Sequence, residues 1–228
     1  PDLNGSVTKS PDQATYVAGT VVTLTAAPAT NYHFTDWSGD AISTTNPLQI
    51  TINADNVITA NFSQGPAPVD LGAAGDFAIL SGAGVTNTGP TIIDGNLGVS
   101  PGSTVTGFPP GIVVNGAMFV ADPTAAAAKV ALTAAYLDAA GRALNVITVP
   151  TGELGGLTLT PGLYISGIGS FAITSVDLTL DAQGDPDAVW IFQMPSSTLT
   201  VGNGRQVVLL NGEAQPANIY WQVGSSAT

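Results

Sequence analysis

The 228-residue sequence contains no cysteine, so neither a disulfide framework nor thiolate chemistry is available to it. Only four residues are basic against 16 acidic ones, which gives a formal net charge of -12. Nucleic acids and anionic membrane surfaces bind basic patches, so the charge balance argues against both as partners. No run of residues is long and apolar enough to span a bilayer. No signal peptide is recognised at Pro1, so we infer localisation from the rest of the sequence.

Charged residues of either sign are scarce, at 9% of the chain, whereas a typical globular chain has about a quarter. Hydrophobic residues reach 44%, which is enough for a substantial core. A chain with so few charges must cover its surface with small neutral residues such as Thr, Ser, Asn, Gly and Ala. We therefore expect a surface that is unusually uncharged.

The chain divides at "SQGPAPVD" (residues 63–70), a short stretch rich in proline and glycine. We expect a small β module over residues 1–62, a linker over 63–69 and a second domain over 70–228. In the first region "VVTLTA" alternates apolar and polar residues from Val21 to Ala26, as a half-buried strand does. The segments "PLQITI" and "NVITANF" repeat this period, with turn residues between them.

The first region resembles the internalin-B-type repeat of bacterial surface proteins. The run Trp37 to Asp40 ("WSGD") and the closing Ala60 to Phe62 ("ANF") carry the resemblance, within "GTVVTLTAAPATNYHFTDWSGD" and "ITINADNVITANF". The resemblance implies a stalk or adhesive spacer outside the cell.

The second region has a fixed spacing. Leucines recur at intervals of 21 residues, each followed by a threonine: Leu157 and Thr158, Leu178 and Thr179, Leu199 and Thr200. A period near twenty, carried by short β segments between turns, indicates a solenoid whose coils stack on one another. We predict a mainly β fold built on a right-handed β-helix, with the leucines inside and the threonines in an outward ladder.

One long helix interrupts this pattern, in "ADPTAAAAKVALTAAYLDAAGRAL" from Ala121 to Leu144. Asp122 is expected to cap it, with Pro123 at its first position and Gly141 near its end. One apolar face is predicted to pack alongside the β-helix. This face comprises Ala125, Ala128, Leu132, Ala135, Tyr136, Ala139 and Ala143, widened by Val130, Leu137 and Leu144.

The second region is similar to the microbial ice-binding protein family, whose fold is a discontinuous β-helix with one helix packed along its side. The motifs that carry the resemblance occur in the family's order: "LGAAGDFAILSGAGVT", "IDGNLGVSPG", "LTPGLY", "DAVWIFQM" and "NIYWQVG". Family members usually continue through further coils after the last motif, whereas this chain stops at Thr228. We therefore expect either a fragment or a partner that completes the β-helix, for example by head-to-tail self-association.

The resemblance implies an ice crystal surface as the binding partner. A flat threonine ladder with rungs about 4.7–4.9 Å apart can hold water in an ordered layer that merges with ice. The candidate ice-binding residues are Thr158, Thr179 and Thr200, then Thr88 and Thr91 of "TGPT", which has a spacing seen on ice-binding surfaces of the family, and further Ser166, Ser170 and Thr174. The alternative is that these residues are ordinary exposed β-strand residues, since threonine favours strands in any case.

Other functional classes find little support. Asp181, Asp185 and Asp187 in "LDAQGDPDAVW" are weighed as calcium ligands, but the run lacks a full ligand pattern and also reads as ordinary turn chemistry. His33 is the only histidine and is expected to be structural. Glu153 and Glu213 are the only glutamates, too few and too far apart to predict a polysaccharide-cleaving enzyme. We expect no enzyme activity, cofactor or metal.

The sequence therefore predicts an extracellular protein, secreted or attached to the cell surface, that binds ice. Its effect would be to inhibit ice growth or recrystallisation, or to attach cells to ice. The alternative is an adhesive or structural surface protein without affinity for ice. Trp190 and Trp221 lie between apolar neighbours and are expected in the core rather than on a sugar-binding surface.

Overall fold

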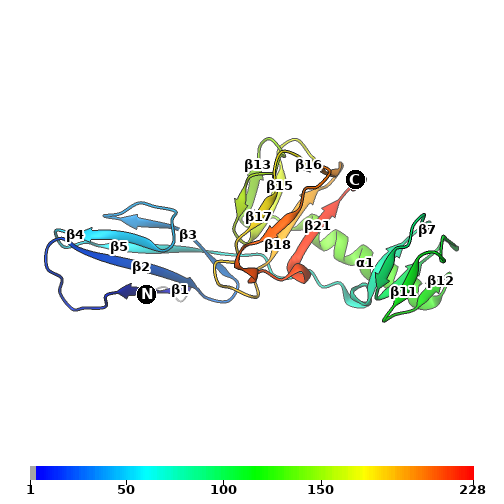
Figure 1. Ribbon diagram of the computed structural model, residues 1–228, viewed down its shortest axis with the longest axis horizontal. Helices are drawn as coiled ribbons and strands as arrows, with labels where there is room; N and C mark the ends of the chain where they lie inside the picture. The colour runs from blue at the N-terminus through cyan, green and yellow to red at the C-terminus, as the bar shows by residue number, and fades with distance from the viewer. Residues whose placement is uncertain (1–3) are drawn as a thin grey trace. The chain divides into compact units, whose positions relative to one another are not determined.

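The structure is a computed structural model that describes residues 4–228 (Figure 1). By the density of its internal contacts the chain forms two compact units. The first unit combines residues up to Pro68 with Arg142–Thr228, and the second unit is Val69–Gly141. The division does not follow the order of the chain, because the second unit interrupts the first.

The amino-terminal part of the first unit is a module of five antiparallel strands in two small sheets. One sheet has the order β1-β2-β4 and the other pairs β3 with β5. The strands are β1 (Gly5–Ser10), β2 (Thr20–Pro28), β3 (Tyr32–Gly39), β4 (Leu48–Ile52) and β5 (Ile58–Gln64). The predicted alternation is confirmed on β2, where Val22, Leu24 and Ala26 are buried while Val21 is exposed.

Aromatic side chains from β3 complete the core of this module. Phe34 and Trp37 are both buried, with ring centroids 5.3 Å apart. The Trp37 indole N–H donates to the Thr45 carbonyl at 3.0 Å, so its polar atom is satisfied. His33 is also buried, and desolvation lowers its pKa from the ordinary value of 6.5. The neutral form is therefore favoured, as expected for a structural histidine.

The rest of the first unit consists of short strands in three sheets, and every strand pairs in parallel. The first sheet is β13 (Val146–Val149), β15 (Gly162–Ser166), β18 (Trp190–Met194) and β21 (Ile219–Val223). The second is β14 (Thr158–Leu159), β17 (Leu178–Leu180) and β20 (Val207–Leu209). The third is β16 (Phe171–Ile173) and β19 (Leu199–Val201). Two short 3-10 helices, η2 (Leu210–Gly212) and η3 (Pro216–Asn218), connect the last strands.

The chain visits these three sheets in turn, and each passage through them is called a coil below. Inward side chains of successive coils stack on one another in the core. Phe192 lies between Tyr164 and Trp221, with ring centroids 5.4 Å and 4.1 Å away. Trp190 is fully buried, as predicted, whereas Trp221 on β21 is half-buried. Within residues 4–228, β21 pairs only with β18.

The second unit is built in the same way, again with parallel pairing between its sheets' strands. It opens with the 3-10 helix η1 (Gly72–Asp76). Its three sheets are β6 (Phe77–Ser81) with β9 (Asn96–Val99) and β12 (Met118–Val120); β7 (Gly84–Thr86) with β10 (Thr104–Thr106); and β8 (Ile92–Asp94) with β11 (Ile112–Val114). Ile93, Leu97 and Val99 form the centre of its core.

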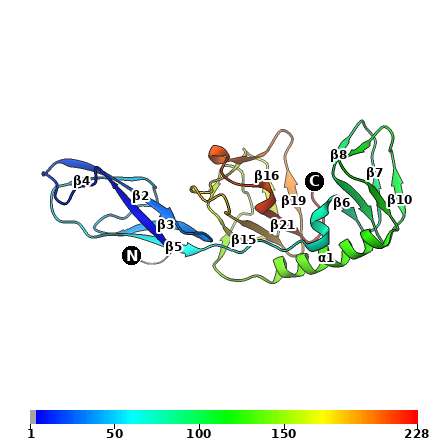
Figure 2. The same cartoon turned by 90° about the horizontal axis from the view of Figure 1, so that it is seen from below.

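Helix α1 (Pro123–Gly141) closes the second unit and contacts η1, β6, β9 and β12 (Figure 2). Its start is as predicted: the Asp122 carboxylate accepts a hydrogen bond from the Thr124 amide at 2.7 Å, and Pro123 is the first helical residue. The buried face is a stripe of small residues, namely Ala125, Ala128, Ala135 and Ala139. Alanine side chains let the helix backbone lie close to the strands.

The predicted widening of the apolar face is wrong. Val130, Leu137 and Leu144 are 72%, 63% and 68% exposed. Because the buried stripe consists of alanines, the contact is narrow, and larger residues to either side do not reach the strands. Within the described residues, no helix is both long and apolar enough to cross a membrane.

Candidate functional site

The outward threonines were predicted to form one ladder, and the structure breaks that ladder after two rungs. Thr158 on β14 lies directly opposite Thr179 on β17. The next residue in this row is Val208 on β20, not Thr200. Thr200 belongs to another sheet, where it lies opposite Ala172. The prediction of a three-threonine ladder is therefore wrong.

The cause is a change in coil length. From Thr158 to its partner Thr179 the coil takes 21 residues, but from Thr179 to Val208 it takes 29. Most of the difference lies in the connection to the next coil: residues 160–161 join β14 to β15, whereas residues 181–189 join β17 to β18. A second step of 21 residues along the sequence therefore ends in the sheet of β16 and β19, which the chain passes through before it reaches β20.

The sheet of β16 and β19 presents a row of small, uncharged side chains to solvent. Ala172 and Thr200 form one rung, and Phe171 and Ile173 on either side of Ala172 point into the core. The row extends at the chain end, because the Thr228 amide donates to the Leu199 carbonyl at 3.0 Å. Ser170 and Thr174 lie directly before and after β16, on either side of this rung, and both carry a hydroxyl group. We call this the β16/β19 face.

A second threonine-bearing surface, which the sequence analysis missed, lies on β7 and β10. Thr86 lies opposite Thr106, and the hydroxyl of Thr106 donates to that of Thr86 at 3.4 Å. Thr104 on the same strand lies opposite Gly84, and all three threonines are exposed. The signal was available as "GVT" and "TVT", 20 residues apart, but it differs from the longer period of the later coils. We call this the β7/β10 face.

The predicted "TGPT" residues lie in the turn that follows β7. Thr88 and Thr91 are both exposed. The Thr91 hydroxyl donates to the side-chain oxygen of Asn87 at 2.6 Å, and the Thr91 amide donates to the Gly89 carbonyl at 2.8 Å. The turn therefore adjoins the β7/β10 face, and a single asparagine holds it in shape.

Ser166 is in a different environment from the other candidates. It is 7% exposed on β15, and its hydroxyl donates to the Ser170 carbonyl. A hydroxyl that is buried and already bonded cannot contact ice. This candidate is therefore wrong, because β15 is buried on almost every residue.

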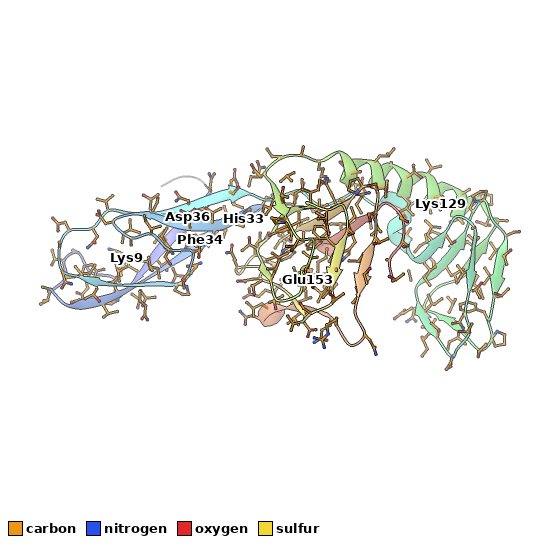
Figure 3. All side chains as sticks on the ribbon, turned by 90° about the horizontal axis from the view of Figure 1, so that it is seen from above. Lys9, His33, Phe34, Asp36, Lys129 and Glu153 are labelled. Atoms are coloured by element: carbon orange, nitrogen blue, oxygen red, sulfur yellow. The ribbon has the colours of Figure 1, made fainter. Side chains whose placement is uncertain are left out.

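The ionisable side chain of Glu153 is bonded to the β16/β19 face, and its position is labelled in Figure 3. It forms an isolated parallel bridge with Ala172. Its carboxylate accepts hydrogen bonds from the Thr174 amide at 3.0 Å, the Thr174 hydroxyl at 2.6 Å and the Gly155 amide at 2.9 Å. Partial desolvation acts to raise the pKa of Glu153, but these hydrogen bonds outweigh it and lower the pKa from its ordinary value of 4.5.

The remaining outward faces are less uniform. Beside β17 the Arg205 guanidinium lies 3.7 Å from the Asp177 carboxylate, and Val208 follows Thr179 in the outward row. On β8 and β11 the exposed residues are Ile92, Ile112 and Asp94. The strands β15 and β18 are buried on almost every residue. Uncharged hydroxyl-bearing rows therefore lie on the β16/β19 and β7/β10 faces, and Thr158 and Thr179 form a further rung that Val208 interrupts.

The aspartates weighed as calcium ligands lie in turns, which the carboxylates of two of them stabilise. The carboxylate of Asp181 accepts from the Gln183 amide at 2.9 Å, and that of Asp185 accepts from the Asp187 amide at 2.9 Å. Among the described residues no group of three or more His, Cys, Asp or Glu side chains is arranged to hold a metal ion. These are the Asx turns that aspartate commonly forms in loops.

The structure thus defines a mainly β protein in which parallel strands stack and one alanine-lined helix packs against them. Residues 79–228 match the Ice-binding-like family, and residues 1–66 match the Divergent InlB B-repeat domain. The chain belongs to the ice-binding-like family and carries a divergent InlB-type repeat in front of the matching region. Both sequence resemblances are therefore confirmed.

Relatives and solved structures that are named as ice-binding proteins agree with this assignment. An ice-binding protein of Nostoc sp. (strain HG1) is 49% identical over 69% of this chain and 56% of its own length. The chain thus spans little more than half of that relative. The crystal structure of an ice-binding protein from an Antarctic biological consortium is 50% identical, with a TM-score of 0.68 over 72% of each chain. That of Antarctomyces psychrotrophicus is 34% identical, with a TM-score of 0.65 over 71% of this chain and 76% of its own.

Proposed function

We propose that this protein binds ice through the β7/β10 and β16/β19 faces, and that it acts outside the cell. The stacked coils wind as a right-handed β-helix, the hand that parallel connections within a sheet nearly always take. Family membership supports ice as the partner, since the relatives above are ice-binding proteins. The InlB-type repeat supports an extracellular place, with the module as a spacer or anchor.

The mechanism is adsorption without chemistry. Successive rungs of a parallel sheet are about 4.7–4.9 Å apart, so the backbone sets a regular interval between outward side chains. Each threonine presents a methyl group, which orders nearby water, and a hydroxyl group, which bonds to it. An ordered water layer of this kind merges with a crystal face, as bridging waters do at other interfaces. Because the strands are already fixed, little conformational entropy is lost on binding.

The observation that carries the choice of faces is that the paired residues of their rungs are small and neutral. Thr86 lies opposite Thr106, and Ala172 lies opposite Thr200, each pair small and neutral. Glu153 lies beside the second pair, but its carboxylate is bonded to Thr174 and Gly155. Ionised side chains orient water around themselves, so neutral rungs favour an ice-like layer, and the hydrogen bonds of the Glu153 carboxylate limit its effect on the water beside Ala172.

The test compares bulky substitutions on two kinds of face. Thr106→Tyr and Thr200→Tyr place a large ring on the proposed faces, while Thr179→Tyr places it on the β14/β17/β20 sheet. We expect the first two to reduce thermal hysteresis about tenfold or more, because a protruding ring prevents flat contact, and the third to change it little. Circular dichroism checks that each variant is folded.

The same measurements decide between the alternatives. Loss of activity in Thr179→Tyr alone would move the ice-binding surface to the Thr158 and Thr179 row. If the unsubstituted protein neither shapes ice crystals nor enters a growing ice hemisphere, it is a surface protein without affinity for ice.

A further inference from the structure

Asn87 occupies the corner where the chain leaves β7 and turns toward β8. Its side-chain amide donates to the Gly89 carbonyl at 2.6 Å and to the Gly107 carbonyl at 2.9 Å. Its side-chain oxygen accepts from the Thr91 hydroxyl at 2.6 Å. Three of the four hydrogen bonds that a carboxamide can make are thus formed, within its own turn and to the next coil.

The surroundings leave room for this side chain and for little else. A Cβ atom added at Gly111 would lie 2.6 Å from the Asn87 side-chain nitrogen. A Cβ atom added at Gly107 would lie 1.8 Å from the Asn87 carbonyl oxygen, and Gly107 has a φ of +81°. Glycine is the residue that tolerates both this backbone conformation and such a close approach. The two glycines of the next coil therefore leave the space that Asn87 occupies.

The bonds of Asn87 determine how its neighbours face solvent. The backbone N–H of Asn87 donates to the Thr106 carbonyl at 3.0 Å and aligns the two coils beside the Thr86 and Thr106 rung, while the side-chain bond to the Gly107 carbonyl holds the residue that follows Thr106. The Thr91 hydroxyl proton points inward to Asn87, so Thr91 offers water its methyl group and its oxygen lone pairs. Thr88 makes no side-chain hydrogen bond to another described residue, so its hydroxyl is free to bond to water.

We propose that Asn87 is a positioning residue for ice binding: its carboxamide sets the spacing and orientation of Thr86, Thr88 and Thr106. This inference rests on the proposed function and deepens it, since it names the residue that holds the β7/β10 face in register. Asn87 does not itself contact ice. It acts by keeping the threonines around it in one arrangement, which a regular ice surface requires.

Another asparagine makes a comparable bond between coils and provides a matched control. The Asn115 side-chain amide donates to the Asp94 carboxylate at 2.9 Å, at the end of β8 and β11, away from the β7/β10 rungs. Asn115 has a φ of 51°, so Asn115→Ala loses the bond and also strains the backbone. It should therefore also destabilise the fold, which makes it a control for a loss of stability away from the β7/β10 face.

The experiment uses the whole chain and compares Asn87→Ala, Asn87→Asp, Asn115→Ala and Thr106→Tyr. Asn87→Asp has the same size and keeps the acceptor for Thr91, but it loses both donated bonds, so it tests the inference even if the alanine variant does not fold. Thermal hysteresis and adsorption of the fluorescently labelled protein to an ice hemisphere are measured near 0 °C. Thermal unfolding is measured in parallel.

We expect both Asn87 variants to lose about tenfold in ice adsorption while folded, as the loss of several positioned hydrogen bonds implies. Asn115→Ala should unfold at a lower temperature yet retain adsorption within about twofold, because its bonds lie off the β7/β10 face. Equal losses in Asn115→Ala and Asn87→Ala, or full activity in Asn87→Asp, would overturn the inference. Full activity in Thr106→Tyr would instead overturn the proposed β7/β10 face, so the two failures are distinguishable.

Discussion

Glu153 and Thr174 are joined by two hydrogen bonds, because both the amide and the hydroxyl of Thr174 donate to the Glu153 carboxylate, at 3.0 Å and 2.6 Å. The pair connects the end of β16 to the preceding segment, where no strand has formed. The side chain of Glu153 therefore adds two bonds to the single backbone bridge between Glu153 and Ala172 at this edge of the β16/β19 face.

This pair makes stability depend on pH. The folded pKa of Glu153 lies below its ordinary value of 4.5, so the unfolded chain binds the proton more readily than the folded one. The stability that Glu153 contributes is complete above that ordinary value and is lost as the pH falls through the lower folded pKa. We expect the free energy of unfolding, measured in urea, to fall less between about pH 6 and pH 3 in Glu153→Gln than in the parent protein.

The charge-matched control for this prediction is Glu213→Gln, which removes one carboxylate away from Thr174. The prediction fails if the two glutamine variants have the same pH profile. A result of that kind would show that the acid sensitivity does not come from this hydrogen-bonded pair.

Features that depend on neighbouring residues in the sequence were predicted well. The start of α1 at Pro123 follows from Asp122 and the fixed φ of proline, both of which act within one turn. The alternation on β2 follows from the two faces of any strand, so Val22 and Leu24 were expected inside. These patterns need no knowledge of what packs against them.

Features that depend on loop length and on the partner surface were not predicted. The 21-residue spacing predicts that Thr200 follows Thr179, but the long connection over residues 181–189 shifts it to another sheet. Similarly, the apolar character of Leu137 does not predict whether a strand packs against it. Because the contact made by the alanines is narrow, Leu137 is exposed. The β7/β10 face was missed because its coil is shorter than those that set the period.

The alanine stripe of α1 gives a second prediction. Ala128 is fully buried against the strands of the second unit, so Ala128→Leu forces a larger side chain into a close contact. We expect a loss of about 1–3 kcal/mol in the free energy of unfolding, as is typical of overpacked cores. Leu137→Ala, at a 63% exposed position on the same helix, serves as the control and should change stability by no more than about 0.5 kcal/mol. Urea unfolding followed by circular dichroism measures both, and equal effects would contradict the assignment of the buried face.

The aromatic stack of the first unit gives a third prediction. Phe192 is fully buried between Tyr164 and Trp221, so Phe192→Ala leaves a cavity and removes both ring contacts. We expect a loss of about 3–5 kcal/mol, the usual range for a buried phenylalanine. Burial also raises the pKa of Tyr164 to about 12, and the opened cavity should return it toward 10.0. Ultraviolet titration of tyrosine absorbance tests this second effect, and an unchanged titration would show that water does not reach the cavity.

The last prediction concerns the amino-terminal module. There the side chain of Asn46 forms the hydrogen bonds to β2 that the backbone does not form at this position. Strand β4 begins at Leu48, opposite Leu24, and Pro47 just before it has no N–H to donate to a neighbouring strand. The Asn46 carboxamide instead accepts from the Ala26 amide at 2.9 Å and donates to the Ala26 carbonyl at 2.8 Å. It thereby satisfies both backbone groups of a residue that is only 3% exposed.

Asn46→Ala leaves these two groups without a partner in a buried position. Because an unsatisfied buried polar group costs about 1–3 kcal/mol, we expect destabilisation in that range and faster hydrogen exchange at the Ala26 amide. Asn56→Ala is the matched control, since Asn56 is exposed and its side chain bonds only to the nearby Ala54 carbonyl. Exchange at Ala26 that stays as slow as in the Asn56 variant would mean that another group protects this amide. Asn46→Ala should leave ice adsorption unchanged as long as the protein is folded, because Asn46 belongs to the amino-terminal module and not to either proposed ice-binding face.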